Sequence, residues 1–114
     1  KDIMQDGELS CSFFTSSILI IFQLVKKPHA TVKGIVKDME KSGWKKIKKP
    51  KVGSVIVWES VDSENGDIHK HIGFYIGVNQ VISNSSKKRH PVRHHWTFND
   101  KRKIEAIYWN KKLN

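Results

Sequence analysis

Apolar residues concentrate in one stretch near the start of the chain, between Phe13 and Val25. Several recur at the three- to four-residue spacing of a helix face: Phe14, Ile18, Ile21, Phe22 and Val25. Ser10 or Ser12 can cap such a helix, and Lys26-Lys27-Pro28 can end it because proline cannot continue a helix. The stretch therefore predicts a buried helix, although its β-branched residues also suit a strand. It is shorter than the roughly 20 residues that span a bilayer, so we expect no transmembrane segment.

A second helix is predicted after Thr31, which can cap it, and before Gly43, which can end it. Its apolar stripe consists of Val32, Ile35, Val36 and Met39. From residue 54 onward the period changes to two, which predicts strands over residues 54–59, 71–76, 80–84 and 104–109. Turns are predicted at Asn65-Gly66 and at residues 77–79. Helices followed by a meandering antiparallel sheet indicate an α+β class, and the length indicates a single domain over residues 1–114.

The formal net charge of +10 favours an anionic partner, such as nucleic acid, an acidic membrane surface or a cell-wall polymer. A single cysteine excludes an internal disulfide and leaves the redox compartment open. Acidic residues (Asp2, Asp6 and Glu8) precede the apolar run, so it does not resemble a signal peptide and we expect no targeting segment in this chain. We expect a monomer.

The single cysteine, Cys11, stands directly before the apolar run. If the helix begins at Ser10 to Ser12, unpaired backbone N–H groups and the helix dipole lower the pKa of the thiol below about 8.5 and can hold an oxyanion. His71 opens a predicted strand and can act as the base, which is the arrangement of papain-like thiol catalysis. A cysteine beside an apolar run is equally typical of an ordinary core residue.

Four segments, in this order, resemble elements of the NlpC-type peptidoglycan peptidases. ELSCSFF resembles their nucleophile motif and PHATVKGIVKDMEKSGW their second helix. VGSVIVWE resembles one of their sheet strands, and HIGFYIG resembles the strand that carries their histidine. The similarity runs from Glu8 to Ser83, and CHAP amidases share the same general plan. Three positions depart from the family pattern: Ser10 and Phe13 beside the cysteine, and Val52 before the first strand.

The resemblance implies a papain-like fold in which the central N-terminal helix packs on an antiparallel sheet. It implies Cys11 as nucleophile and His71 as base, with no metal or organic cofactor. The implied substrate is a peptide or amide bond in peptidoglycan, cleaved through a thioester, and the implied location is extracellular or in the cell envelope. The main alternative is a non-catalytic basic module that binds a cell-wall polymer or nucleic acid.

The resemblance also implies a third polar residue on the strand after His71. Equal spacing points to Ser83, and Asn84 is next to it. Because side chains alternate along a strand, the hairpin loop decides between them: a two-residue loop, Val78-Asn79, puts Asn84 on the His71 face, and a three-residue loop puts Ser83 there. We predict Asn84, whose amide oxygen can orient an imidazole N–H.

Further histidines invite a zinc interpretation: His29, His69, His90, His94 and His95. No HExxH motif, CxxC motif or spaced carboxylate accompanies them, so we expect solvated loop histidines and no metal site. Basic segments and four tryptophans could form a nucleic-acid surface, but no nucleic-acid motif is present and core packing explains the tryptophans. We therefore expect no nucleic-acid partner.

Overall fold

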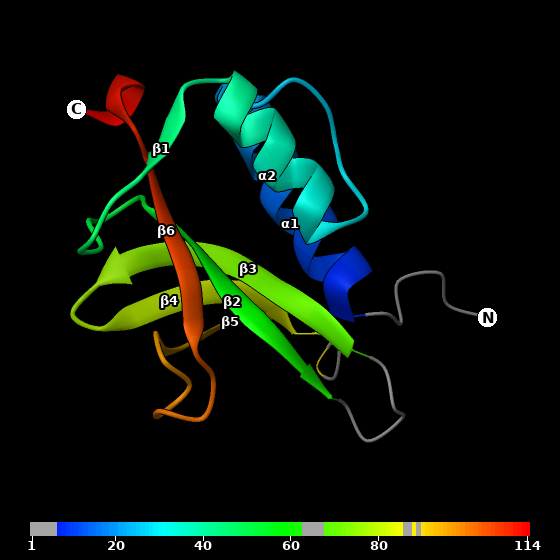
Figure 1. Cartoon of the computed structure of the whole chain (residues 1–114), viewed down its shortest axis with the longest axis vertical. Coiled ribbons are helices and arrows are strands. Elements are labelled where there is room, and N and C mark those ends of the chain that lie inside the picture. The colour runs from blue at the N-terminus through cyan, green and yellow to red at the C-terminus, as the bar shows by residue number, and fades with distance from the viewer. Residues whose placement is uncertain (1–6, 63–67, 86–87, 89) are drawn as a thin grey trace.

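A six-stranded antiparallel sheet makes up most of the protein (Figure 1). The computed structural model describes residues 7–62, 68–85, 88 and 90–114, so the predicted Asn65-Gly66 turn lies outside the described residues. The helices are α1 (Gly7–Ile21), α2 (Val32–Lys41) and a short 3-10 helix, η1 (Lys111–Leu113). The strands are β1 (Trp44–Lys46), β2 (Val55–Asp62), β3 (Ile68–Gly77), β4 (Gln80–Ser85), β5 (His90–His95) and β6 (Ile104–Asn110), in the spatial order β1-β6-β2-β3-β4-β5.

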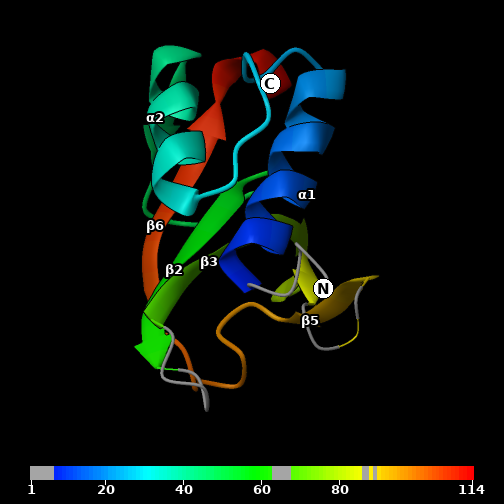
Figure 2. The same cartoon turned by 90° about the vertical axis from the view of Figure 1, so that its right-hand side faces the viewer.

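The expected papain-like fold with a central helix is wrong. The sheet dominates, and the two α-helices are short, with 15 and 10 residues, and lie on one side of it (Figure 2). The apolar run suggested a helix enclosed on all sides. In the structure Ile21 and Phe22, at the end of this run, are 73% and 68% exposed, so α1 buries only part of its circumference. Among the described residues, no helix is long and apolar enough to cross a membrane.

Helix α1 also begins and ends earlier than the sequence predicted. It starts at Gly7, so Cys11 is its fifth residue and lies beyond the unpaired N–H groups of the first turn. It ends where Gln23 adopts a left-handed conformation, with φ of 58°. The Leu24 N–H donates to the Leu19 carbonyl and the Gln23 N–H to the Ile20 carbonyl, the pattern of a Schellman cap. The helix therefore stops well before Pro28.

Side chains of β2 alternate between two cores. Val55 and Val57 point to a core that α1 and α2 cover, whereas Ile56 and Trp58 point to a second core on the other face. Trp58 pairs with His71 of β3, so His71 shares the face of the second core. Loop residues that follow β5 pack against that second core.

Asp38 of α2 fixes the segment that connects the two helices. Its carboxylate accepts hydrogen bonds from the backbone N–H groups of Lys26 and Lys27, from Ser42 Oγ and from His29 Nε2, which lies 2.7 Å away. Burial raises the pKa of Asp38, but the hydrogen bonds from His29, the two backbone groups and Ser42 together bring it below the ordinary value of 3.8. The buried carboxylate is therefore charged and fully engaged at neutral pH.

Candidate active site

His71 lies in an aromatic environment on the face of the second core. Its ring centroid is 5.3 Å from that of Trp58 and 5.8 Å from that of Phe98, and the residue is only 8% exposed. Phe98 comes from the loop after β5 and stacks on His94, with 4.1 Å between ring centroids. Rings from β2 and from this loop thus hold the imidazole of His71 in place.

A chain of buried hydrogen bonds leads away from His71. The Nε2 atom of His71 is 2.8 Å from Ser83 Oγ, and the same oxygen is 2.7 Å from Nε2 of His94. The Nδ1 atom of His94 is 2.8 Å from the backbone carbonyl of His95. The chain therefore runs from β3 through β4 to β5 and ends on a backbone acceptor.

The carbonyl acceptor at the end of this series of hydrogen bonds determines where each proton in the series lies. A carbonyl oxygen can only accept, so Nδ1 of His94 bears a hydrogen and its Nε2, when the ring is neutral, can only accept. Ser83 has a single proton to donate and gives it to His94. Ser83 Oγ then accepts from Nε2–H of His71, which leaves the lone pair of the neutral His71 ring on Nδ1.

The electrostatics of His94 agree with this assignment. Burial lowers the pKa of His94, the hydrogen bond to the His95 carbonyl raises it in part, and the nearby His95 ring lowers it again. The net effect is a pKa below the ordinary value of 6.5, so the ring is neutral at neutral pH. A neutral His94 is the acceptor that the chain requires.

The predicted placement of Asn84 on the His71 face is wrong, and Ser83 occupies that place. The two-residue loop is present, because Gly77 pairs with Gln80. However, the register shifts between Tyr75 and Gly77, because β3 has one extra residue there, which forms a bulge. The bulge moves each side chain of β4 to the face opposite to the one that the two-residue loop alone would give, so Ser83 and not Asn84 faces His71.

Gly73 makes this arrangement possible. A Cβ atom at Gly73 would lie 2.7 Å from Cβ of Ser83 and 2.6 Å from the Ile82 carbonyl, so a larger residue would push the two strands apart. Because Gly73 has no side chain, Ser83 can approach β3 closely and reach His71, which lies two residues before Gly73 on the same face of the strand.

Cys11 is fully buried in the core under the helices, with 0% of the residue exposed. The helix that carries this thiol contacts both β3, which carries His71, and β4. Polar residues surround Cys11 along the helix. The hydroxyls of Ser12 and Thr15 are buried and have no hydrogen-bond partner, which is rare in folded proteins.

Arg102 brings a positive charge near Cys11. Burial lowers the pKa of the Arg102 guanidinium, whereas a thiolate at Cys11 raises it, so the two groups interact electrostatically and the cation in turn stabilises the thiolate form. Nε of Arg102 donates to the Glu59 carbonyl at 3.3 Å, and the guanidinium lies 5.8 Å from the Phe98 ring. No sequence pattern indicated Arg102, because it stands among loop lysines.

An open cavity of about 410 Å³ adjoins the hydrogen-bonded chain. It is lined by His94, His95, Phe98, Asn99, Lys101 and Arg102. Three consecutive non-glycine residues at this loop (98–100) have positive φ angles of 55°, 57° and 66°. Such backbone costs energy and is concentrated at functional sites.

The other histidines whose side chains the structure describes lie apart from one another or belong to the hydrogen-bonded chain. Among the described residues, no three His, Cys, Asp or Glu side chains form a group that could hold a metal ion. His29 pairs with Asp38, and His90 is exposed at the edge strand. The side chain of His69 lies outside the part of the chain that the structure describes.

Comparison with known proteins gives no assignment: no protein-family model and no curated protein matches this chain.

Proposed function

We propose that the protein is a cysteine hydrolase that cleaves a peptide or amide bond, with Cys11 as nucleophile and His71 as base. The observation that supports this most directly is the hydrogen-bonded chain His71–Ser83–His94. It fixes the tautomer of His71 so that Nδ1 holds the lone pair, and a general base needs a defined acceptor. Ser83 takes the orienting role that the sequence analysis gave to Asn84.

The reaction would proceed in two stages. Nδ1 of His71 takes the proton of the Cys11 thiol, and the thiolate attacks the carbonyl carbon of the scissile bond. The tetrahedral intermediate expels the amine, which receives the proton from His71, and a thioester remains on Cys11. Water then attacks the thioester as His71 takes one of its protons, and the C–S bond breaks to release the carboxylic acid and the Cys11 thiolate, which recovers the proton from His71. Throughout, Nε2–H of His71 keeps its bond to Ser83, so the chain stabilises both the neutral and the protonated ring.

The charges near Cys11 and the cavity favour an acidic substrate. Arg102 stabilises a thiolate at Cys11 and also lines the open cavity with Lys101 and His95. The resemblance to NlpC-type peptidases indicates peptidoglycan peptides, which bear carboxylates, and the net charge of +10 would attract such a polymer. Cleavage of this substrate would occur outside the cell or in its envelope.

The mechanism requires that Cys11 become accessible to substrate, because the residue is fully buried in the core that the helices cover. Alkylation by iodoacetamide under native conditions tests this first. We expect labelling of Cys11 at pH 7 that slows in Arg102→Gln, since loss of the cation removes thiolate stabilisation. A thiol that reacts only in denaturant would instead identify Cys11 as an ordinary core residue and favour a non-catalytic binding module.

Mass spectrometry of defined muropeptides after incubation with the protein tests the activity itself. We expect cleavage that is abolished in Cys11→Ala and in His71→Ala. His90→Ala is the matched control, because His90 is exposed and bonds only to its neighbouring Pro91 carbonyl among the contacts described. Turnover that survives His71→Ala would contradict the proposal.

A further inference from the structure

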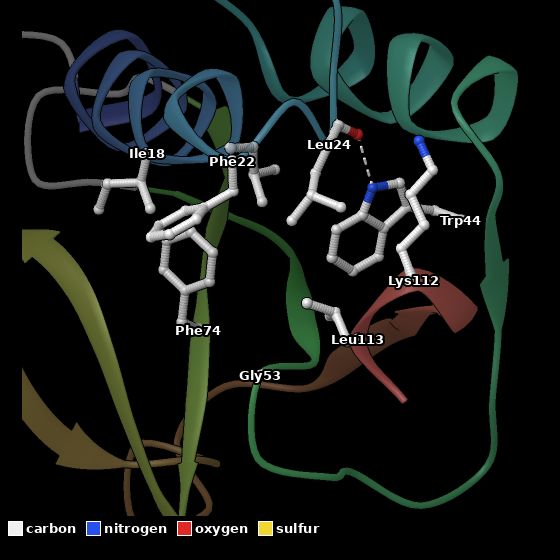
Figure 3. Close-up of a pocket in the computed structure, with 9 residues that line it drawn as sticks. Ile18, Phe22, Leu24, Trp44, Gly53, Phe74, Lys112 and Leu113 are labelled. Atoms are coloured by element: carbon white, nitrogen blue, oxygen red, sulfur yellow. Dashed lines mark hydrogen bonds between the residues drawn. The ribbon is translucent and has the colours of Figure 1, made fainter.

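A second cavity of about 410 Å³ lies at the opposite end of α1 from Cys11 (Figure 3). Phe22, which directly follows α1, and Phe74 of β3 form one side of it, and Trp44 and Leu113 form the other. Phe22 is 68% exposed and Leu113 is 39% exposed, so large apolar side chains border an opening to solvent. The apolar run predicted that this end of the helix would be buried, and the proposed hydrolase activity makes no use of the cavity.

The polar groups at this cavity are few. The indole Nε1 of Trp44 already donates to the Leu24 carbonyl at 2.9 Å, so it requires nothing from a ligand. Lys112 of η1 is the one charged residue among those that line the cavity, and it is exposed (Figure 3). The site thus combines an apolar interior with one cation near solvent, which matches a ligand that has an apolar chain and one anionic end.

We propose that this cavity binds a soluble single-chain alkyl carboxylate, with the chain between Phe22, Phe74 and Trp44 and the carboxylate at Lys112. The volume falls in the range of known ligand pockets, about 300–1,000 Å³, and exceeds the roughly 150 Å³ that suffices for benzene. The net charge of +10 adds a general attraction for the anion. This site is independent of the proposed hydrolase activity.

Isothermal titration calorimetry with octanoate, decanoate and dodecanoate, below their micelle concentrations, tests the proposal. We expect saturable binding that tightens by about fourfold for each added methylene while the chain fits the cavity. Lys112→Gln should weaken decanoate binding by up to about fivefold and leave 1-decanol unaffected, because only the charge contact is lost. Lys111→Gln is the matched control, since Lys111 is exposed in the same η1 turn and does not line this cavity.

A second pair of variants tests the apolar side of the cavity. Phe22→Ser should weaken decanoate binding by tenfold or more, whereas Phe13→Ser should not, because Phe13 is 46% exposed on α1 and does not line the cavity. Circular dichroism would verify that both variants fold. The proposal is overturned if decanoate shows no saturable binding, if both serine variants bind equally well, or if the protein binds only to lipid vesicles and not to soluble carboxylate.

Discussion

Ser83→Ala is the substitution that examines the candidate site most closely. The hydroxyl is 1% exposed and joins two histidines, at 2.8 Å from His71 Nε2 and 2.7 Å from His94 Nε2. Each such hydrogen bond contributes a net of about 1 kcal/mol, and a buried partner left unsatisfied costs about 1–3 kcal/mol. Since water has little access, we expect the free energy of unfolding to fall by about 2–4 kcal/mol.

The same substitution should change the chemistry of His71. Ser83→Ala removes an acceptor that favours the proton on Nε2, so the share of the Nδ1–H tautomer should rise, and in that form the ring cannot take the Cys11 proton at Nδ1. We expect kcat on a defined muropeptide to fall on the order of 10- to 100-fold, a part of what a general base contributes. Nitrogen-15 NMR of the histidine rings measures the tautomer directly, which a purely structural loss would not alter.

Asn84→Ala is the control, because Asn84 follows Ser83 directly in β4 and its side chain therefore points to the other face of the sheet. It should leave the His71 tautomer and kcat close to those of the unmodified protein. The reasoning is refuted if nitrogen-15 spectra show Nδ1–H at His71 in the unmodified protein, or if Asn84→Ala slows turnover while Ser83→Ala does not.

The remaining predictions concern stability and are measured by urea denaturation. Thr15→Val should raise the free energy of unfolding by about 1 kcal/mol because the buried Thr15 hydroxyl has no partner. Ser16→Ala should lower the free energy of unfolding by about 1 kcal/mol, since Ser16 Oγ accepts from the His29 N–H at 3.0 Å. If both substitutions changed stability in the same direction, this reasoning would be contradicted. Asp38→Asn should cost about 2 kcal/mol at pH 7. Because the native pKa of Asp38 lies below 3.8, the stabilisation by its carboxylate is complete above that pH and disappears as the pH falls through the native pKa. A difference in the free energy of unfolding between Asp38→Asn and the unmodified protein that did not change with pH would contradict this. Val78→Asn should stabilise by about 1 kcal/mol, because Val78 has φ of 52° and is 92% exposed, and a loss of stability would count against strain there.

The strands of the sheet centre could be predicted because their signals are local. Alternation located β2, β3, β4 and β6 to within a few residues, and the Thr31 side chain caps α2 as expected by accepting from the Gly34 N–H. Strands β1 and β5 were missed. Both lie at edges, where Lys45, Pro91 and Arg93 replace the apolar alternation that a buried strand shows.

The candidate site was predictable only in part. The sequence indicated His71 and gave Ser83 or Asn84 as its partner, but the choice depended on a single extra residue in β3, which leaves no signature in the residue types. His94 was considered only as a metal ligand or a loop residue, because its role depends on β5 pairing with β4. The start of α1 was misplaced because serines near Cys11 offered a cap that the helix does not use.

The position of β6 in the sheet has a consequence for synthesis of the chain. β6 is the last strand in sequence, yet it lies between β1 and β2 and pairs with both (Figure 1). While the ribosome has not yet released residues 104–110, β1 has no partner and β2 exposes an unpaired edge along Val55, Ile56 and Val57. Such an apolar edge can recruit a strand of another molecule, so the nascent chain is prone to aggregation along β2 until β6 emerges, and the six-stranded sheet is complete only after that point.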